Sequence, residues 1–110
     1  MSGGDGNATL RIDKWLWHAR LAKTRSLAAR LCALGAVELG GRPVVKPNQS
    51  VRIGSRIAVV QGRHRRRVEV LALGTRRGPA SEAQTLYREL APPEPLSRFP
   101  EDWEPLLADS

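Results

Sequence analysis

The sequence predicts an α+β domain in which two N-terminal helices pack on a small, mainly antiparallel sheet and a further helix follows. Two changes of hydrophobic pattern indicate this order. Apolar side chains recur at helical spacing over residues 11–35 and alternate over residues 37–70. Helical spacing returns after the Gly78-Pro79 step, which is typical of a helix start. With 110 residues, of which 41% are apolar, the chain can fill the core of one small domain.

The first helix is expected to use Asp13 as its N-cap and to end near Leu21. Its buried face consists of Ile12, Trp15, Leu16 and Ala19. The residues nearer the other side are Lys14, Trp17 and His18. Residues two apart on a helix point in different directions. Trp15 is therefore assigned to the core, whereas Trp17 either packs on a neighbouring element or offers an exposed surface for base stacking.

The second helix is predicted to start after Thr24, whose hydroxyl can accept a hydrogen bond from an amide of the first turn. Its apolar stripe consists of Leu27, Ala28, Leu31 and Leu34. Gly35 suits the left-handed position that follows a helix, and Cys32 is expected to be a packed thiol. Arg25 opposes the helix macrodipole at a cost of ~0.3 to 1 kcal/mol, which a bound phosphate could relieve.

The middle of the chain is predicted to form a hairpin and three further short strands. The hairpin turn is Gly40-Gly41, because this pair can adopt the positive φ angles of a two-residue turn between Val37-Leu39 and Val44-Val45. The apolar residues of the further strands are Val51, Ile53, Ile57, Val59, Val68 and Val70. Gly54-Ser55 and Gln61-Gly62 separate these strands.

Three segments are expected along the chain: a disordered leader over residues 1–8, a domain over 9–90 and a proline-rich acidic tail over 91–110. The helix at the end of the domain has an apolar face of Ala83, Leu86, Tyr87 and Leu90. Phe99 and Trp103 are expected to anchor the tail locally.

Charge is distributed unevenly along the chain. The net charge is +7, but residues 1–78 contain 16 of the 18 Lys and Arg and 4 of the 11 Asp and Glu, which gives +12 there and −5 in the remainder. Such a basic region favours nucleic acid as a partner through counterion release. The single Cys32 excludes an internal disulfide, and no apolar run could span a bilayer. We therefore expect a cytoplasmic protein without a membrane partner.

The candidate binding residues centre on the two helices, where residues 11–35 hold six cations and one acid. The candidate phosphate contacts are Arg11, Lys14, Arg20, Lys23, Arg25 and Arg30, with Thr24 and Ser26 as neutral donors. Arg42 and Lys46 extend this surface beside the hairpin. A second basic block consists of Arg63, His64, Arg65, Arg66 and Arg67. This block is either a sequence-independent RNA contact or a soluble strand edge that discourages pairing.

Four blocks of sequence resemble the heat shock protein 15 family, a single-domain branch of the ribosomal-protein S4 type of RNA-binding domain. The blocks are RIDKWL at 11–16, ARLAKTRSLA at 19–28, GAV at 35–37 and RRGPASEA at 76–83. The resemblance implies an S4-like fold with its alpha-L motif, a helix pair on a small sheet that presents cations to structured RNA. Two departures are Gly40, where asparagine is expected, and the acidic tail, which stands in place of basic helical sequence.

The resemblance also implies a ribosomal role. Its partners would be ribosomal RNA and peptidyl-tRNA on large ribosomal subunits that stalled with a nascent chain attached. The protein would help to return these subunits to translation under heat or other stress. Weaker binding to DNA is expected beside the RNA binding.

Catalysis is not predicted, because the chain carries no glycine-rich phosphate loop, zinc signature or evident pair of carboxylates. We expect a monomer that is not an enzyme and needs no metal or cofactor. Two alternatives stay open: a DNA-binding regulator of helix-turn-helix type and a general basic nucleic-acid binder. A third interpretation, the targeting module of an RNA-modifying enzyme, is not expected, because it needs a catalytic domain that a tail of about 20 residues cannot provide.

Overall fold

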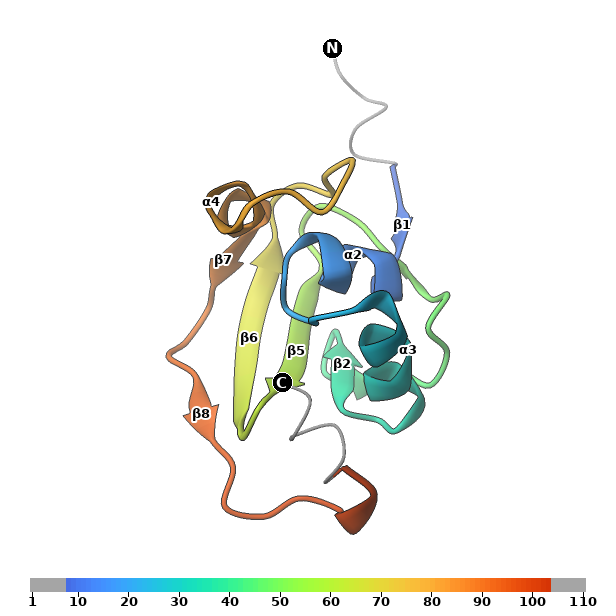
Figure 1. The fold of residues 1–110 in the computed structure, drawn as a ribbon, viewed down its shortest axis with the longest axis vertical. Helices are drawn as coiled ribbons and strands as arrows, with labels where there is room; N and C mark the ends of the chain where they lie inside the picture. The colour runs from blue at the N-terminus through green and yellow to red at the C-terminus, as the bar shows by residue number, and fades with distance from the viewer. Residues whose placement is uncertain (1–7, 104–110) are drawn as a thin grey trace.

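The computed structural model describes residues 8–103, and in it two helices cover one face of an antiparallel sheet (Figure 1). The helical segments are α2 (Ile12–His18), α3 (Arg25–Ala33), α4 (Ala80–Ala83) and the 3₁₀ turns η1 (Gln84–Leu86) and η2 (Glu101–Trp103). The strands are β1 (Leu10–Arg11), β2 (Val37–Leu39), β3 (Arg42–Pro43), β4 (Ser50–Val51), β5 (Arg56–Gln61), β6 (His64–Val70), β7 (Tyr87–Glu89) and β8 (Glu94–Pro95). The predicted α+β class is confirmed. The predicted leader lies, apart from Ala8, outside the described residues.

The main sheet has six strands in the order β3-β2-β5-β6-β7, and β8 pairs with β6 beyond the end of β7. Every pairing is antiparallel. The longest ladder joins β5 to β6, with Ile57 opposite Val68 and Val59 opposite Arg66. A separate two-stranded pairing joins β1 to β4 and brings the start of α2 beside the loop that precedes β4.

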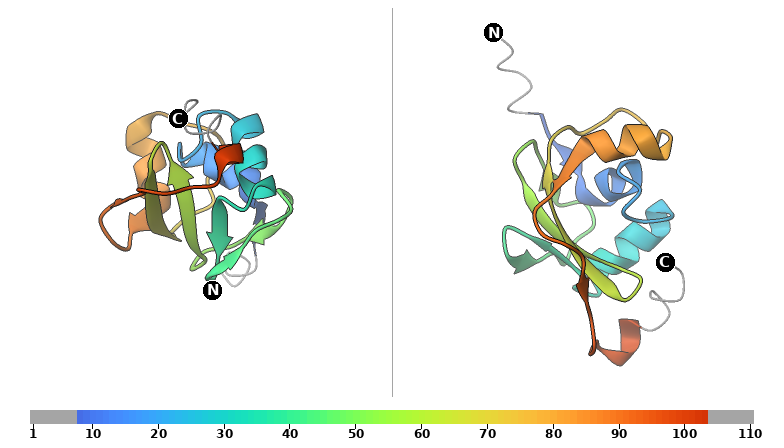
Figure 2. Two further views of the ribbon diagram at one scale, coloured as in Figure 1. Left: turned by 90° about the horizontal axis from the view of Figure 1, so that it is seen from below. Right: turned by 90° about the vertical axis from the view of Figure 1, so that its left-hand side faces the viewer.

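The core lies between the sheet and the helices, which Figure 2 shows on the same side of the strands. Its largest fully buried side chains include Trp15, Ile12 and Leu16 from α2 and Leu31 from α3. The sheet contributes alternating residues of β5 and β6, namely Ile57, Val59, Val68 and Val70. Burial of these faces is what makes two short helices stable, because isolated helices of this length are unstable in water.

The first helix differs from its prediction at both ends. Asp13 is not the N-cap; that position belongs to Arg11, and Asp13 lies in the first turn with its carboxylate accepting from the Lys14 amide at 2.8 Å. The helix ends at His18 because Arg20 adopts a positive φ of 57°, which redirects the chain before Leu21. His18 was placed nearer the polar side, but it is buried.

The second helix and the hairpin follow their predictions closely. Thr24 caps α3, its Oγ1 accepting from the Leu27 amide at 3.0 Å. Gly35 has a φ of +74° just beyond the helix, and Gly40 and Gly41 have φ of +61° and +84° in the turn between β2 and β3. These are the left-handed conformations that glycine adopts without strain.

The last helix is shorter than predicted. After the single turn of α4 and the 3₁₀ turn η1, the chain becomes strand β7, in which Tyr87 pairs with Val70 of β6. Tyr87 therefore belongs to the sheet, and Leu90 is 38% exposed rather than part of a helical face. The free edge of β6 offers backbone partners that a continued helix would leave unsatisfied, which accounts for the switch to strand.

The tail is anchored by its aromatic residues, as predicted. Trp103 is 8% exposed, and its Nε1 donates to the carbonyl of Leu34 at 3.0 Å, beyond the last residue of α3. Phe99 and Leu96 pack against the core cluster that contains Val60. The view from below in Figure 2 shows the tail crossing the end of the sheet to reach α3.

Cys32 is a packed thiol, as predicted, because it is fully buried within α3. Burial, together with the nearby Asp13 carboxylate, raises the pKa of this thiol to about 12. The reactive thiolate is therefore scarce in the folded protein at neutral pH.

We expect iodoacetamide to alkylate Cys32 in the folded protein at least about a hundredfold more slowly than after unfolding in guanidinium chloride, since reaction requires exposure and ionisation of the thiol. Mass spectrometry of timed samples measures both rates. Equal rates in the two conditions would contradict the packing described for α3.

Candidate nucleic-acid interface

Two of the helical cations converge on one buried carboxylate. Arg11 Nη2 lies 3.0 Å and Arg25 Nε 3.8 Å from Asp13 Oδ2, and the Asp13 side chain is 4% exposed. The backbone beside Lys46 lies close to this group, because the carbonyl of the following residue, Pro47, accepts from the Asp13 amide at 3.2 Å. One acid therefore faces two cations, and this Asp13 group, which consists of Arg11, Asp13 and Arg25, keeps an excess of positive charge.

A second group of cations surrounds the turn between α2 and α3. Arg20 and Lys23 of this turn and Arg77 of the segment before α4 line a pocket of about 220 Å³, together with Gln61. The sequence analysis named Arg20 and Lys23 but not Arg77 as binding residues. Arg77 lies within the RRGPASEA block, and its basic side chain was the only signal that could have pointed to it.

The segment of residues 72–78 is fastened to α2 by a set of hydrogen bonds that we name the α2 clasp. Its bonds are Trp15 Nε1 to Ala72 O at 2.9 Å, His18 Nδ1 with Leu73 O at 3.1 Å, Arg20 Nε to Gly78 O at 2.7 Å and Arg77 Nη1 to Trp17 O at 3.4 Å. Because a carbonyl only accepts, Nδ1 is the protonated nitrogen of His18. The clasp satisfies the buried polar atoms of α2 and brings Arg77 to the turn.

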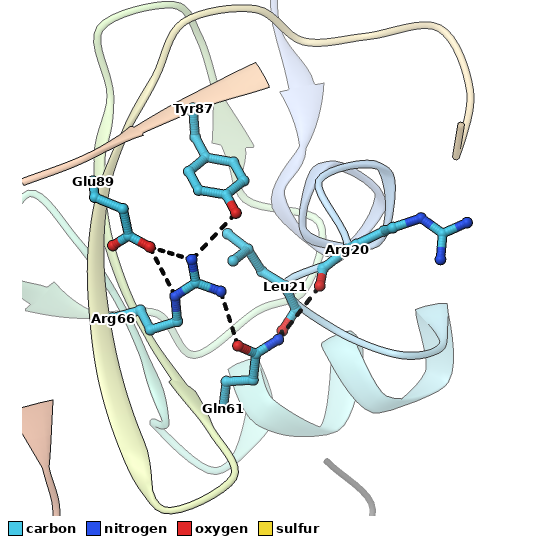
Figure 3. A network of polar contacts seen from close by, with 6 residues as sticks. All are labelled: Arg20, Leu21, Gln61, Arg66, Tyr87 and Glu89. Atoms are coloured by element: carbon cyan, nitrogen blue, oxygen red, sulfur yellow. Dashed lines mark hydrogen bonds and ion pairs between the residues drawn. The ribbon is translucent and has the colours of Figure 1, made fainter. Parts of the chain in front are cut away.

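The sheet contributes a polar network that reaches the same turn (Figure 3). Gln61 Nε2 donates to the carbonyls of Arg20 at 3.4 Å and Leu21 at 3.5 Å. Arg66 Nη1 donates to Gln61 Oε1 at 2.9 Å, and Arg66 also bonds the hydroxyl of Tyr87 at 3.2 Å and the carboxylate of Glu89. Arg66 therefore orients the amide that holds the turn.

Arg66 is an internal cation rather than a free one. Burial by itself lowers its pKa, but the hydrogen bonds to Glu89 and Tyr87 outweigh this effect, and the pKa of Arg66 lies above the ordinary value. The guanidinium lies 5.6 Å from the centroid of the Tyr87 ring. Arg66 is thus fully engaged within the protein.

The rest of the arginine block faces the tail. Arg67 Nη1 lies 2.8 Å from Glu94 Oε1, and Arg63 lies 4.8 Å above the centroid of the Phe99 ring. The hydrogen bond from Arg67 lowers the pKa of Glu94. The interpretation of this block as a soluble strand edge is wrong, because β6 is paired on one side by β5 and on the other by β7 and β8.

The remaining predicted binding residues lie on the helix pair, at the turn before α3 and, for Arg42, on the sheet. Lys14 is half-buried on α2, whereas Ser26 and Arg30 are exposed on α3. The Thr24 hydroxyl is used by the helix cap. Arg42 lies in β3 at the edge of the sheet, and it belongs neither to the Asp13 group nor to the pocket at the turn. Trp17 is half-buried, with the Arg77 guanidinium 5.8 Å from its ring centroid.

The described part of the chain holds no metal site, no membrane-spanning helix and no free buried carboxylate. Residues 8–103 contain no cluster of His, Cys, Asp and Glu that could hold a metal ion. Within the same residues, no helix is long and apolar enough to cross a membrane. Asp13, the only buried carboxylate among the described residues, is occupied by Arg11 and Arg25.

Comparison with known proteins defines the class. Residues 10–57, which cover β1, both helices and the start of the sheet, match the family model of the S4 domain. The helix pair on its antiparallel sheet, with cations gathered at the turn and at the start of α3, is that of an S4-type RNA-binding domain.

The particular family follows from longer matches. The chain is 43% identical over 82 residues to heat shock protein 15 of Escherichia coli K12; the match covers 74% of this chain and 61% of that protein. It is 38% identical over 80 residues to the homologue of Haemophilus influenzae, and this match covers 73% of this chain and 60% of the homologue. A solved structure of Vibrio cholerae heat shock protein 15, described as trimeric, matches with a TM-score of 0.72 and 43% identity over 76% of this chain and 84% of that one. The chain belongs to the heat shock protein 15 family.

Replacing Arg66 with alanine should lower the free energy of unfolding by about 1–3 kcal/mol, because Glu89, Tyr87 and Gln61 would each lose a hydrogen bond in a partly buried site. Arg67→Ala is the matched control, since Arg67 is 45% exposed and its pairing with Glu94 is a surface ion pair. The control should change stability by less than ~1 kcal/mol. Urea unfolding followed by circular dichroism measures both, and equal losses would contradict the role assigned to the network.

Proposed function

We propose that this protein is a non-enzymatic, cytoplasmic RNA-binding protein that acts on large ribosomal subunits stalled with a nascent chain on tRNA. In this proposal it binds ribosomal RNA and the peptidyl-tRNA and helps to recycle the subunit under heat or other stress. The observation that carries the RNA-binding part is the S4-type helix pair with its uneven charge. The ribosomal part rests on membership of the heat shock protein 15 family, of which the chain spans about 61% of the E. coli member's length.

The proposed RNA contacts come from the helical cations and their neighbours. They are Arg11, Lys14, Arg20, Lys23, Thr24, Arg25, Ser26, Arg30, Arg42 and Lys46. The Asp13 group and the pocket at the turn give this surface its positive field, while the tail acid Glu94 pairs with Arg67 of the sheet. Phosphate contacts of this kind provide affinity and position without reading sequence. Structured RNA is therefore the proposed ligand, with weaker binding to DNA.

The proposal includes a monomer without metal or cofactor. The trimeric description of the V. cholerae structure concerns that protein, and light scattering of this chain tests the monomer directly. The runner-up is a DNA-binding regulator of helix-turn-helix type. Equal or tighter binding to a selected DNA duplex than to structured RNA would favour it over our proposal.

We expect the affinity for structured RNA to fall roughly a thousandfold between 50 and 200 mM salt, because about six phosphate contacts release their counterions on binding. Fluorescence anisotropy of a labelled RNA hairpin measures the slope. A nearly flat profile would contradict the electrostatic mode of binding.

Removing single charges distinguishes this surface from the rest of the protein. Lys14→Ala and Lys23→Ala should each weaken RNA binding about three- to tenfold with little change in melting temperature. Arg88→Ala is the matched control, because Arg88 is 62% exposed on β7 and pairs with Glu69. A loss of affinity in the control as large as in the helical variants would show that net charge alone governs binding.

Co-sedimentation tests the ribosomal part separately. We expect selective retention on purified large subunits that carry peptidyl-tRNA, compared with empty subunits, at physiological salt and with excess competitor DNA. Equal weak retention on both kinds of subunit would leave a general nucleic-acid binder and would contradict the stalled-subunit role.

A further inference from the structure

The pocket at the turn between α2 and α3 combines three cations with one amide. Its volume is about 220 Å³, and its lining residues are Arg20, Leu21, Lys23, Leu27, Gln61 and Arg77. The two leucines form an apolar wall, and the lining contains no acidic residue. Charged groups beside an apolar wall interact more strongly with a ligand than they would in open water.

Two of the three cations are fixed in place by the α2 clasp. Arg20 uses its Nε to hold the Gly78 carbonyl at 2.7 Å and has a positive φ of 57°. Arg77 donates to the Trp17 carbonyl and lies over the Trp17 ring. Both guanidiniums are therefore positioned before any ligand arrives, which reduces the entropy lost on binding. A left-handed residue other than glycine costs free energy and is often found at functional sites.

Within residues 8–103, no acid lines the pocket or forms an ion pair with its three cations. Burial and then the nearby Arg20 lower the pKa of Arg77, so the two guanidiniums disfavour each other. Other arginines of the chain have carboxylate partners: Arg11 and Arg25 share Asp13, and Arg76 lies 2.8 Å from Glu82. A bound anion would supply the missing charge and the acceptors for the forked donors of arginine.

The size of the pocket selects among anions of nucleic acids. Pockets for drug-sized ligands occupy roughly 300–1,000 Å³. At about 220 Å³, this pocket has room for a phosphate group but not for a whole nucleotide. Its position at the turn places it within the proposed RNA surface.

We propose that Arg20, Lys23 and Arg77 form a site for a single phosphate group of bound RNA. Arg77 completes this site from a segment remote in sequence, and Gln61 holds the turn beside it. This inference rests on the proposed RNA-binding function and adds a particular ligand group and a residue outside the S4-matched segment. Both an internal phosphodiester and a terminal phosphate have the required chemistry. The site fixes the position of the RNA on the protein and does not read its bases.

Adjacent arginines provide a matched test. Arg77→Ala should weaken binding to an RNA hairpin about tenfold and reduce the salt slope by about one counterion, whereas Arg76→Ala, 66% exposed and outside the pocket, should change affinity less than ~twofold. The hairpin is used with a 5′-hydroxyl and with a 5′-phosphate. A loss at Arg77 with both hairpins assigns the site to an internal phosphodiester, and a loss confined to the 5′-phosphorylated hairpin assigns it to the terminal phosphate. Equal effects of the two alanine variants would overturn the proposal.

Two further variants separate binding from folding. Arg77→Lys keeps the charge but loses the fork, so it should keep the salt slope while losing affinity severalfold. Lys23 is exposed, and Lys23→Ala combined with Arg77→Ala should weaken binding less than the product of the single effects, because both contact the same phosphate. Strict multiplication of the two effects would contradict a shared site.

Inorganic phosphate distinguishes failure of this inference from failure of the proposed function. Millimolar phosphate should shift the Nε–Hε signals of Arg20 and Arg77 in NMR spectra of the wild-type protein and leave that of Arg76 unchanged. If wild-type protein binds RNA but neither phosphate nor Arg77→Ala has an effect, the pocket site is wrong and the RNA-binding function stands. If wild-type protein binds no RNA, the function fails, whatever phosphate does.

Discussion

The α2 clasp is the constraint on which the rest of the surface depends. The two helices are short, and the turn between them contains a residue with a positive φ, Arg20. Neither helix propensity nor the turn itself would hold this geometry in water. Hydrogen bonds from Trp15, His18 and Arg20 to the segment of residues 72–78 hold it instead, and each satisfies a polar atom in or beside the core. Cations from distant parts of the chain are thereby brought to one turn.

The polar network of the sheet supports the turn from the other side. Gln61 contacts the turn carbonyls, and Arg66 orients Gln61 through a guanidinium that is itself held by Glu89 and Tyr87. The arginine block of β6 is thus divided. Arg66 serves the fold, and Arg67 pairs with the tail acid Glu94, so these two cations of the block are matched by acids of the protein itself. The order of charges along the sequence gives no indication of this division.

Local patterns predicted most of the architecture. Thr24, Gly35 and the Gly40-Gly41 turn were placed correctly because their conformations depend on near neighbours in sequence. The errors at Asp13, His18 and Tyr87 have a common origin, since each of these residues takes a partner far away in the chain or a role that depends on it. Arg77 was missed as a pocket residue for the same reason. Periodicity carries no information about which distant carbonyl will accept a hydrogen bond from a given side chain. Such bonds bring Arg20 and Arg77 together, so the sequence predicted the helical cations but not how they are grouped in space.

The central claim is that RNA binds to the helix pair and the pocket at its turn, rather than to the arginine-rich outer strands. Mapping of backbone amide shifts in the ¹⁵N-labelled protein, on titration with an RNA hairpin, tests this most directly. The account predicts that the largest shifts fall in α2, at the start of α3 and around Arg77. Shifts confined to β6, β7 and β8, with α3 unchanged, would contradict it.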